Sequence, residues 1–435
     1  MRAVANILKN QQALSRLSNA RSYASAAASN GIQVVSTAGS HSDPQTASVS
    51  VVIRAGSRYE GVENSGAAHF LKNWAFRNTS PRTSFRTIRE AELQGATLFA
   101  EADRESITYT VECFKEDVPF FVDVLGDVVT STKFAQHEFD EIAKQVQFEA
   151  LSARSSPVTR VIDDLHHAVY RNGLGNSLYA LSSTPVKTAQ DVSNYAKKAF
   201  TASNVAVVGT GIDAQELAQI VGSSATISKL AAVTGPLVES TLSKFHAGQS
   251  KYSDNDSSVF YYALGFEGPK DAATSAVLAE LLGSGSHIKW GQGVSPLSQI
   301  GQSVGAKVQA FSANYTDSNL VGVVIAAPND KAADAVKKVA AEIQKIASSS
   351  VSEEAVKRAV ASAQLQYALQ SETRGGVRQS LACEAISPSQ KIDTAKFSAL
   401  TTQALSQAAS ATFAKPSVSA FGNSRVTPYL DTLGF

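Results

Sequence analysis

Short runs of β-branched and aromatic residues recur along the chain. Residues 49–54 and 259–264 are two such runs, and each is followed by a segment that contains glycine. Runs of this length and composition predict β-strands. Between the runs, longer stretches repeat their apolar residues every three to four positions, which predicts amphipathic helices. The pattern therefore predicts an α+β protein.

The predicted elements occur twice in the same order. Each half has a strand, a helix of small residues, a helix that closes on Gly-Ala, a pair of strands, a long helical region and a last strand that ends at glycine. Corresponding positions in the two halves are about 210 residues apart, as Gly95 and Gly305 are. We interpret the halves as two homologous domains, each a mainly antiparallel sheet packed against helices.

The domain boundaries follow from where these patterns stop. We expect a first domain at residues 24–222, a linker at 223–248 and a second domain at 249–435. In the linker, Ser, Thr and Ala replace the periodic patterning. A chain of 435 residues is also too long for one compact core.

The first 23 residues differ from the rest of the chain. They contain four basic residues and no acidic one, and they lack the continuous apolar core of a secretory signal. This composition is typical of a mitochondrial transit peptide, and a disordered basic tail is the alternative. Because Arg21 stands two residues before the bond, we predict cleavage between Tyr23 and Ala24.

Composition narrows the classes of function. The chain is 43% hydrophobic and 18% charged, which is ordinary for a globular protein. A formal charge of +1 argues against a nucleic-acid partner. No apolar run approaches the ~20 residues of a transmembrane helix. Cys113 and Cys383 match no metal or redox spacing, so we interpret them as buried thiols in a reducing compartment.

The helix predicted at residues 64–77 has one buried stripe, and either Asn64 or Ser65 is expected to cap its start. The apolar residues at i, i+3, i+4, i+7 and i+8 are Ala67, Phe70, Leu71, Trp74 and Ala75.

The same helix carries the candidate chemistry on a second face. His69, Lys72 and Asn73 fall at i, i+3 and i+4. An inverted zinc-peptidase motif, His-x-x-Glu-His, would place its glutamate base and second histidine where Lys72 and Asn73 stand. A lysine is cationic and repels a metal ion, and an asparagine is a poor zinc ligand. Taken alone, these residues favour a surface helix with three polar side chains.

Other motifs are weaker. The adjacent His166 and His167 would point in different directions on a helix and could not hold one metal ion together. Glycines at 209–211 follow a predicted strand but are not continued as a dinucleotide-binding loop. The glycine-rich stretch at 283–293 lacks the Gly-Lys-Ser/Thr ending of a P-loop, which leaves a flexible connector and a peptide or subunit contact equally open.

Five longer stretches, spread over both halves, carry a specific resemblance. They are Tyr109-Thr-Val-Glu-Cys-Phe-Lys-Glu-Asp-Val118, Asp164-Leu-His-His-Ala-Val-Tyr-Arg-Asn172, Asn176-Ser-Leu-Tyr179, Leu282-Gly-Ser-Gly-Ser-His-Ile-Lys-Trp-Gly-Gln-Gly293 and Ser312-Ala-Asn-Tyr-Thr-Asp-Ser-Asn-Leu320. Together with the repeat and the histidine helix, they resemble the pitrilysin-type peptidases and their mitochondrial relatives, which are the processing-peptidase subunits and the core proteins of respiratory complex III. The short glycine-rich loop favours the core proteins over the non-catalytic processing-peptidase subunit.

This resemblance implies a fold and a site. The two domains would face each other like a clamshell, with a zinc motif on the first helix after the first strand and a glutamate ligand farther on. The corresponding positions here are His69, Lys72, Asn73 and Glu149. Only His69 and Glu149 match the family, so the resemblance implies a degenerate homologue that is not an enzyme and has no metal or cofactor.

The resemblance also implies a role. The chain is expected to be a non-catalytic core subunit of ubiquinol–cytochrome c reductase (complex III) that supports assembly and stability of the complex. It would be peripheral on the matrix side of the mitochondrial inner membrane, without a transmembrane helix. Core protein 1, cytochrome b, cytochrome c1 and the other subunits would be its partners. The alternative is the non-catalytic, presequence-binding subunit of the mitochondrial processing peptidase.

Overall fold

The computed structural model describes residues 24–27, 31–37, 45–181, 183–231, 242–254, 257–283, 293–348, 351–387, 390–426 and 428–435. The expected transit peptide, residues 1–23, lies outside the described residues. So do residues 232–241 of the expected linker and residues 284–292 of the glycine-rich stretch. None of the helices in the described part is long and apolar enough to cross a membrane.

The first half of the chain is built on a six-stranded sheet with the order β1-β2-β6-β3-β5-β4. Its strands are β1 (Ala24–Ala27), β2 (Gln33–Thr37), β3 (Thr46–Ile53), β4 (Thr97–Ala102), β5 (Ile107–Phe114) and β6 (Val205–Thr210). Its helices are α2 (Ala67–Asn73), α3 (Ser84–Leu93), α4 (Val118–Thr130), α5 (Gln136–Ser155), α6 (Pro157–Tyr170), α7 (Ala189–Ala199), α8 (Ala214–Ser223) and α9 (Ala225–Ala231). Short 3₁₀ helices are η1 (Ser57–Tyr59), η2 (Val62–Asn64), η3 (Lys115–Asp117), η4 (Gly173–Gly175) and η5 (Ala202–Asn204).

The second half is built on a five-stranded sheet with the order β7-β11-β8-β10-β9. Its strands are β7 (Gln249–Ser253), β8 (Val259–Gly268), β9 (Lys307–Asn314), β10 (Asn319–Pro328) and β11 (Ser417–Gly422). Its helices are α10 (Ala272–Leu282), α11 (Pro296–Val304), α12 (Ala332–Ser348), α13 (Glu353–Glu372), α14 (Arg374–Ile386), α15 (Thr394–Ala399) and α16 (Thr402–Thr412). The 3₁₀ helices η7 (Ser424–Val426) and η8 (Leu430–Leu433) follow β11.

The two sheets repeat one topology. In each, a strand pairs in parallel with the last strand of the half, and the remaining pairs are antiparallel. The register agrees as well, because Gln33 stands opposite Ala206 in the first sheet and Gln249 stands opposite Val418 in the second. The prediction of two homologous α+β units is therefore confirmed. β1 alone, among the described strands, has no counterpart in the other half.

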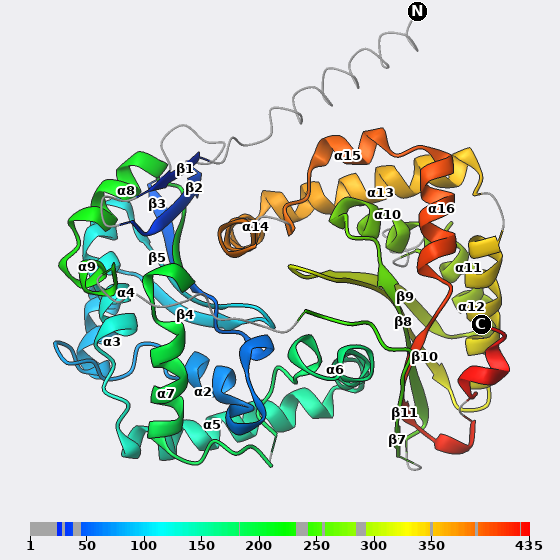
Figure 1. Ribbon diagram of the computed structural model, residues 1–435, viewed down its shortest axis with the longest axis horizontal. Helices are drawn as coiled ribbons and strands as arrows, with labels where there is room; N and C mark the ends of the chain where they lie inside the picture. The colour runs from blue at the N-terminus through cyan, green and yellow to red at the C-terminus, as the bar shows by residue number, and fades with distance from the viewer. Residues whose placement is uncertain are drawn as a thin grey trace, which may run out of the picture.

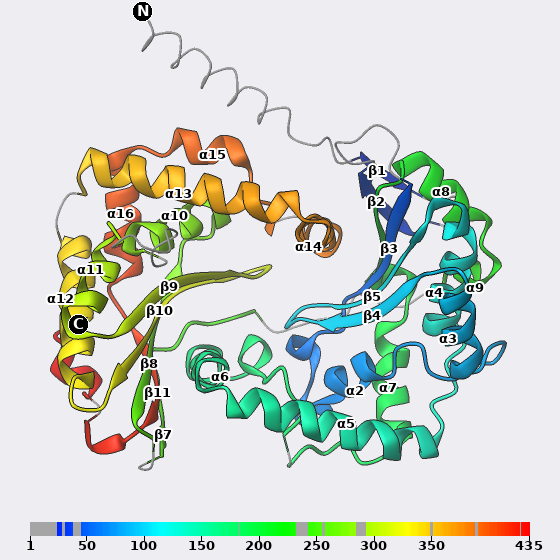
Figure 2. The same ribbon diagram turned by 180° about the vertical axis from the view of Figure 1, so that it is seen from behind.

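Each half lends one helix to the other. Figures 1 and 2 show α14, from the second half, and α6, from the first half, lying between the two halves. Apolar residues of α14 are buried on the first sheet in a cluster formed by Val377, Leu381, Ala382, Ala385 and Ile386 with Val35, Val52, Ala206 and Val208. Apolar residues of α6 are buried on the second sheet in a cluster that includes Val161, Leu165, Val169, Ala263, Leu320, Val324 and Phe421.

The β4–β5 hairpin of the first half and the β9–β10 hairpin of the second half also meet at their tips. Arg58 of η1 bonds Glu105, at the β4–β5 tip, at 2.5 Å and Asp317, at the β9–β10 tip, at 2.7 Å. The Arg58 side chain is 3% exposed, so both ion pairs are shielded from water. The backbone N–H of Thr316 donates to the Glu105 carboxylate at 3.2 Å. A charged network therefore fixes the two tips against each other.

The exchange of helices predicts that damage to α14 loosens the other half. We expect Leu381→Ala to lower the free energy of unfolding by about 2–4 kcal/mol, because Leu381 is fully buried. Amide hydrogen exchange in β6 should become faster. Leu369→Ala, at a half-exposed position of α13, is the matched control and should change stability by less than about 1 kcal/mol. Unchanged exchange in β6 would contradict the interdependence of the halves.

Candidate functional site

The helix α2 is shorter than the predicted one. It begins at Ala67 because Gly66 adopts φ 92°, in the left-handed region that favours glycine, and it ends at Asn73. Phe76, three residues later, also has a positive φ of 58°. The prediction of a helix over 64–77 was therefore wrong at both ends. The expectation that Asn64 or Ser65 caps it was wrong too, since Gly66 is the N-cap residue.

A buried carboxylate from outside the helix takes over the capping role. Glu60 accepts hydrogen bonds from the backbone N–H groups of Gly66 at 2.8 Å and Ala68 at 2.7 Å. These donors have no intrahelical partner, so the carboxyl oxygens of Glu60 satisfy them. Burial raises the pKa of Glu60 to about 8, although both hydrogen bonds oppose the shift. Glu60 thereby sets the direction in which α2 presents its polar face.

His69 is buried on that face, with only 3% exposure. The backbone N–H of Ala180 donates to His69 Nδ1 at 3.1 Å. Since a backbone N–H can only donate, Nδ1 is the unprotonated nitrogen, and Nε2 carries the hydrogen that it donates to Glu149 Oε2 at 2.7 Å. Burial lowers the pKa of His69, and the nearby Lys72 ammonium adds to this, so the neutral ring is favoured.

Three donors from α2 converge on a single carboxylate oxygen from α5. Besides His69, Lys72 Nζ donates to Glu149 Oε2 at 2.7 Å and Asn73 Nδ2 donates to it at 3.1 Å. Gln145 Nε2 donates to Oε1 of the same carboxylate at 3.2 Å. Burial alone would raise the pKa of Glu149, but the hydrogen bonds from Lys72, His69 and Asn73 lower it to about 2. The cluster is therefore an ionised glutamate that accepts hydrogen bonds from one lysine and three neutral donors.

This donor set does not fit a zinc ion. Zinc needs three or four deprotonated nitrogen, sulfur or oxygen ligands from the protein and repels a nearby cation. Here the Nε2 atom of His69 is already engaged as a donor, and the ammonium of Lys72 lies against the carboxylate that would be the second ligand. Within the described residues, no group of three or more His, Cys, Asp or Glu could hold a metal ion.

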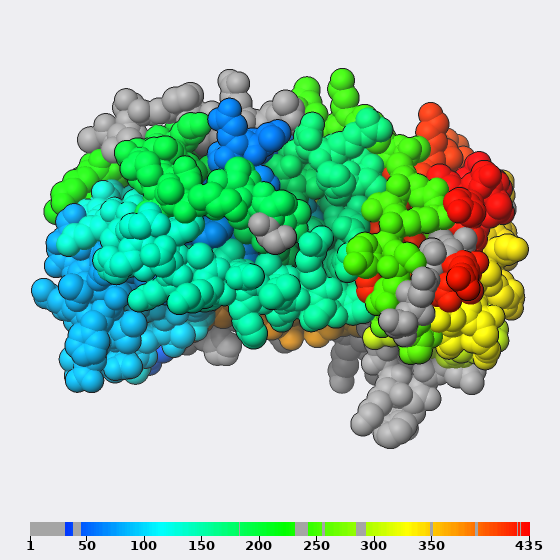
Figure 3. All heavy atoms as spheres, turned by 90° about the horizontal axis from the view of Figure 1, so that it is seen from below, coloured from blue at the N-terminus to red at the C-terminus, as the bar shows by residue number. Residues whose placement is uncertain are grey.

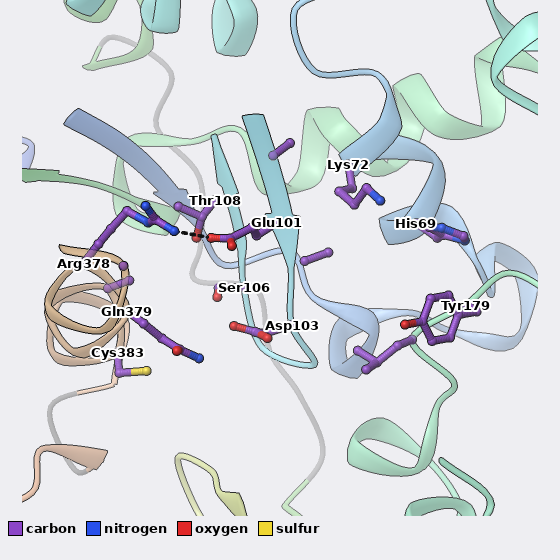
Figure 4. A pocket seen from close by; sticks show the side chains of 15 residues that line it. His69, Lys72, Glu101, Asp103, Ser106, Thr108, Tyr179, Arg378, Gln379 and Cys383 are labelled. Carbon is purple, nitrogen blue, oxygen red and sulfur yellow. Dashed lines mark hydrogen bonds and ion pairs between the residues drawn. The ribbon is translucent and has the colours of Figure 1, made fainter. Parts of the chain in front are cut away.

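The cluster opens on a cavity of about 500 Å³ between the halves. Figure 4 shows His69, Lys72 and Tyr179 on one side of the cavity and the side chains of α14 on the other. The hairpin of β4 and β5 lies between them and contributes Glu101 and Asp103. Glu101 forms an ion pair of 2.8 Å with Arg378 of α14, so the cavity is closed by residues from both halves.

The structure brings together all four residues that the resemblance singled out, His69, Lys72, Asn73 and Glu149. It separates the two adjacent histidines. His166 is buried and lies 2.8 Å from the hydroxyl of Tyr315, whereas His167 lies on a different face, 3.3 Å from Gly175 O.

Sequence reasoning missed the wall that α14 contributes to the cavity. Arg378, Gln379 and Cys383 line it. The prediction of buried thiols is confirmed for Cys113 but wrong in part for Cys383, which is only half-buried and whose side chain faces the cavity, although burial raises its pKa to about 12. The available signal was the apolar spacing of Val377, Leu381 and Ala385 on a helix that follows another helix directly.

Comparison with known proteins finds a matching family and several similar sequences. The model of the family "Insulinase (Peptidase family M16)" matches residues 35–181, and the model of the "Peptidase M16 inactive domain" matches residues 187–363. The mitochondrial cytochrome b-c1 complex subunit 2 of Cryptococcus neoformans is 34% identical over 398 residues, which cover 89% of this chain and 90% of that protein. The protein of the same name from Yarrowia lipolytica is 31% identical over 422 residues, which cover 96% of this chain and 98% of that protein.

Among solved structures, a chain of complex III2 from Candida albicans has the same fold. The TM-score is 0.80, and the match covers 94% of this chain and 98% of that chain. The sequence identity is 17%, so this likeness speaks for the fold.

The polar cluster predicts how stability depends on pH. The pKa of Glu149 is lower in the folded protein than in the unfolded chain. The ionised side chain therefore adds to the free energy of unfolding above about pH 4.5, and this stabilisation is lost as the pH falls toward 2. We expect Glu149→Gln to unfold more easily than the wild type by about 1–2 kcal/mol at pH 7 and by progressively less toward pH 3.

Urea denaturation at several pH values measures this difference. Glu141→Gln is the matched control on the same helix, because Glu141 makes an exposed 3.3 Å pair with Arg77 and should have almost no effect. A difference for Glu149→Gln that does not shrink at low pH would contradict an ionised, hydrogen-bonded Glu149.

Proposed function

Because this chain belongs to the M16 peptidase family, in the group of the mitochondrial cytochrome b-c1 complex subunit 2 proteins, we propose that it is a non-catalytic core subunit of complex III. It supports the assembly and stability of that complex and carries none of its redox centres. The match supports the proposal because it spans 90% of the Cryptococcus neoformans protein and 98% of the Yarrowia lipolytica protein.

The observation that carries the non-catalytic role is the position of Lys72. Its ammonium lies 2.7 Å from Glu149 Oε2, on the face where the family motif needs a glutamate base and a metal. A lysine at this place supplies the positive charge that Glu149 needs, and it cannot act as a base while protonated. The four positions His69, Lys72, Asn73 and Glu149 are therefore a structural cluster that joins α2 to α5.

The location and partners follow from the same proposal. The chain would lie on the matrix side of the mitochondrial inner membrane as a peripheral subunit, in contact with core protein 1, cytochrome b and cytochrome c1. The acid-free first 23 residues support import into mitochondria, with cleavage between Tyr23 and Ala24.

A second candidate function has one observation in its favour. The cavity beside His69 is about 500 Å³ and its hairpin contributes two acids, Glu101 and Asp103, which suits a basic extended peptide. This would fit a presequence-binding subunit of the mitochondrial processing peptidase. Arg378 pairs with Glu101 inside the same cavity, however, and reduces its negative charge.

Affinity purification of the full chain from mitochondria separates the two functions. We expect membrane partners that show b-type and c-type haem absorbance to co-purify in stoichiometric amounts. A single soluble partner of similar size, together with presequence cleavage by the pair, would overturn the complex III proposal in favour of the processing peptidase.

The degenerate motif predicts that zinc binding can be restored. The double change Lys72→Glu with Asn73→His supplies the base and the second histidine and removes the ammonium. His69 Nε2 and Glu149 Oε2 lie 2.7 Å apart, so both face one place, and zinc binding requires the His69 hydrogen to move from Nε2 to Nδ1. We expect about one zinc ion per purified chain by mass spectrometry, against none in the wild type. Adding His69→Ala to the double variant is the control and should abolish the binding. Stoichiometric zinc in the wild type would contradict the structural role of the cluster.

A further inference from the structure

The two sheets of the repeat differ at one edge. In the first sheet β2 is covered by the extra strand β1, which pairs antiparallel with it from Ala24 opposite Ser36 to Ala27 opposite Gln33. The second sheet ends at β7, and among the described residues no strand pairs with the outer side of β7. In Figures 1 and 2 β7 lies at the lower end of its sheet, on the outside of the molecule.

The equivalence of β2 and β7 holds residue by residue. Gln33 and Gln249 occupy matched places beside β6 and β11. Val35, which is 1% exposed, therefore corresponds to Lys251, which is partly exposed, and buried Ser36 corresponds to Tyr252, which is 49% exposed. The edge that the first half buries is open in the second half.

The backbone of β7 has groups available at this edge. Gly248 O accepts a hydrogen bond from Val418 N, and Asp254 N donates one to Gly422 O, each at 2.9 Å. Residues with even numbers therefore face β11, because backbone direction alternates along a strand. The N–H and C=O groups of Gln249 and Lys251 point away from the sheet, where an added strand would find them.

The side chains at this edge resemble those of a binding site. Tyr252 and Tyr429 are both large and well exposed, at 49% and 61%. Lys251 Nζ lies 3.5 Å from the ring centroid of Tyr429 and has no hydrogen-bond partner, although the atom itself is buried. Arg160 of α6 stacks 3.5 Å from the ring centroid of Tyr252. Tyrosine and arginine are enriched where partner proteins bind. Arg160 already pairs with Asp164 at 3.8 Å, whereas Lys251 Nζ has Asp431 nearby but no hydrogen bond, so the unbonded ammonium of Lys251 favours an acidic partner. From below, Figure 3 shows the light-green part of the chain at the surface between α6 and the red C-terminal residues.

We propose that the outer edge of β7 binds an extended, acidic segment of another subunit, which adds to the second sheet as an antiparallel strand. The strand takes the place that β1 holds in the first sheet and bonds the outward N–H and C=O groups of Gln249 and Lys251. A carboxylate of the segment meets Lys251 Nζ. This inference rests on the proposed role as a subunit of an assembly.

Hydrogen exchange of the wild-type chain tests the proposal directly. In the isolated chain, the amides of Gln249 and Lys251 should exchange at least tenfold faster than in the affinity-purified haem-containing complex. Equal exchange in the two samples would overturn the proposal. Protection that is already present in the isolated chain would also overturn it, in favour of an undescribed segment of this chain if concentration has no effect, or of a second copy if it does.

Three substitutions at one position separate backbone from side chain. Lys251→Pro removes the outward N–H without breaking a bond to β11, since proline is tolerated at a strand edge. We expect it to lower recovery of the complex at least tenfold relative to Lys251→Ala, which keeps the N–H. Lys251→Glu should lower recovery too, because it repels an acidic segment. Equal recovery of all three variants would overturn the proposal.

Thermal denaturation of each variant serves as the folding control. If Lys251→Pro fails to fold, the comparison of Lys251→Glu with Lys251→Ala and the exchange data still decide. The two proposals can fail separately. A wild-type chain that recovers no haem-containing partner contradicts the complex III role, whereas a recovered complex with an unprotected β7 contradicts only this docking site.

Discussion

The reciprocal exchange of α6 and α14 is the constraint on which the rest of the structure depends. One face of each sheet is completed by a helix that belongs to the other half. Leu165 and Leu381 are fully buried in these contacts, and burial of one such side chain stabilises by about 2 kcal/mol. The exchange is tight: a Cβ on Gly265 of β8 would come within 3.0 Å of Leu165. Neither sheet can therefore be covered without the opposite half, and the cavity beside His69 exists only because α14 forms its far wall.

In the polar cluster on α2 and α5, the ammonium of Lys72 supplies the positive charge that a metal ion would supply in the family motif. A carboxylate such as Glu149 in a partly buried place needs a positive partner. Lys72 provides that charge, while His69 and Asn73 complete the coordination of one oxygen as hydrogen-bond donors. The lowered pKa of Glu149 is the consequence. These hydrogen bonds join α2 to α5 at the place where the family motif has a metal.

Local signals and long-range contacts were predictable to different degrees. The repeat, the strands and the α+β class follow from periodicity that lies within a few residues, and the structure confirms them. The ends of α2 were missed because they depend on the positive φ of Gly66 and on a cap from Glu60. The convergence of His69 and Glu149 came from the family resemblance. The apolar spacing along α14 indicates a buried face but not which sheet it covers, since its contacts are long-range: Arg378 and Glu101 are 277 residues apart.

The ion pairs at the hairpin tips explain why this architecture suits a fixed support better than a moving enzyme. An enzyme built as a clamshell must open to admit a substrate, and opening here would break the two contacts that join the hairpin tips, the ion pair of Arg58 with Asp317 and the hydrogen bond from Thr316 N–H to Glu105. The Arg58 side chain is 3% exposed, so water screens this ion pair little, and its loss disfavours the separated state. The exchanged helices add their apolar contacts to the same resistance. Rigidity between the halves holds every outer surface, the β7 edge included, at a constant position, and a subunit that binds several neighbours at once requires that.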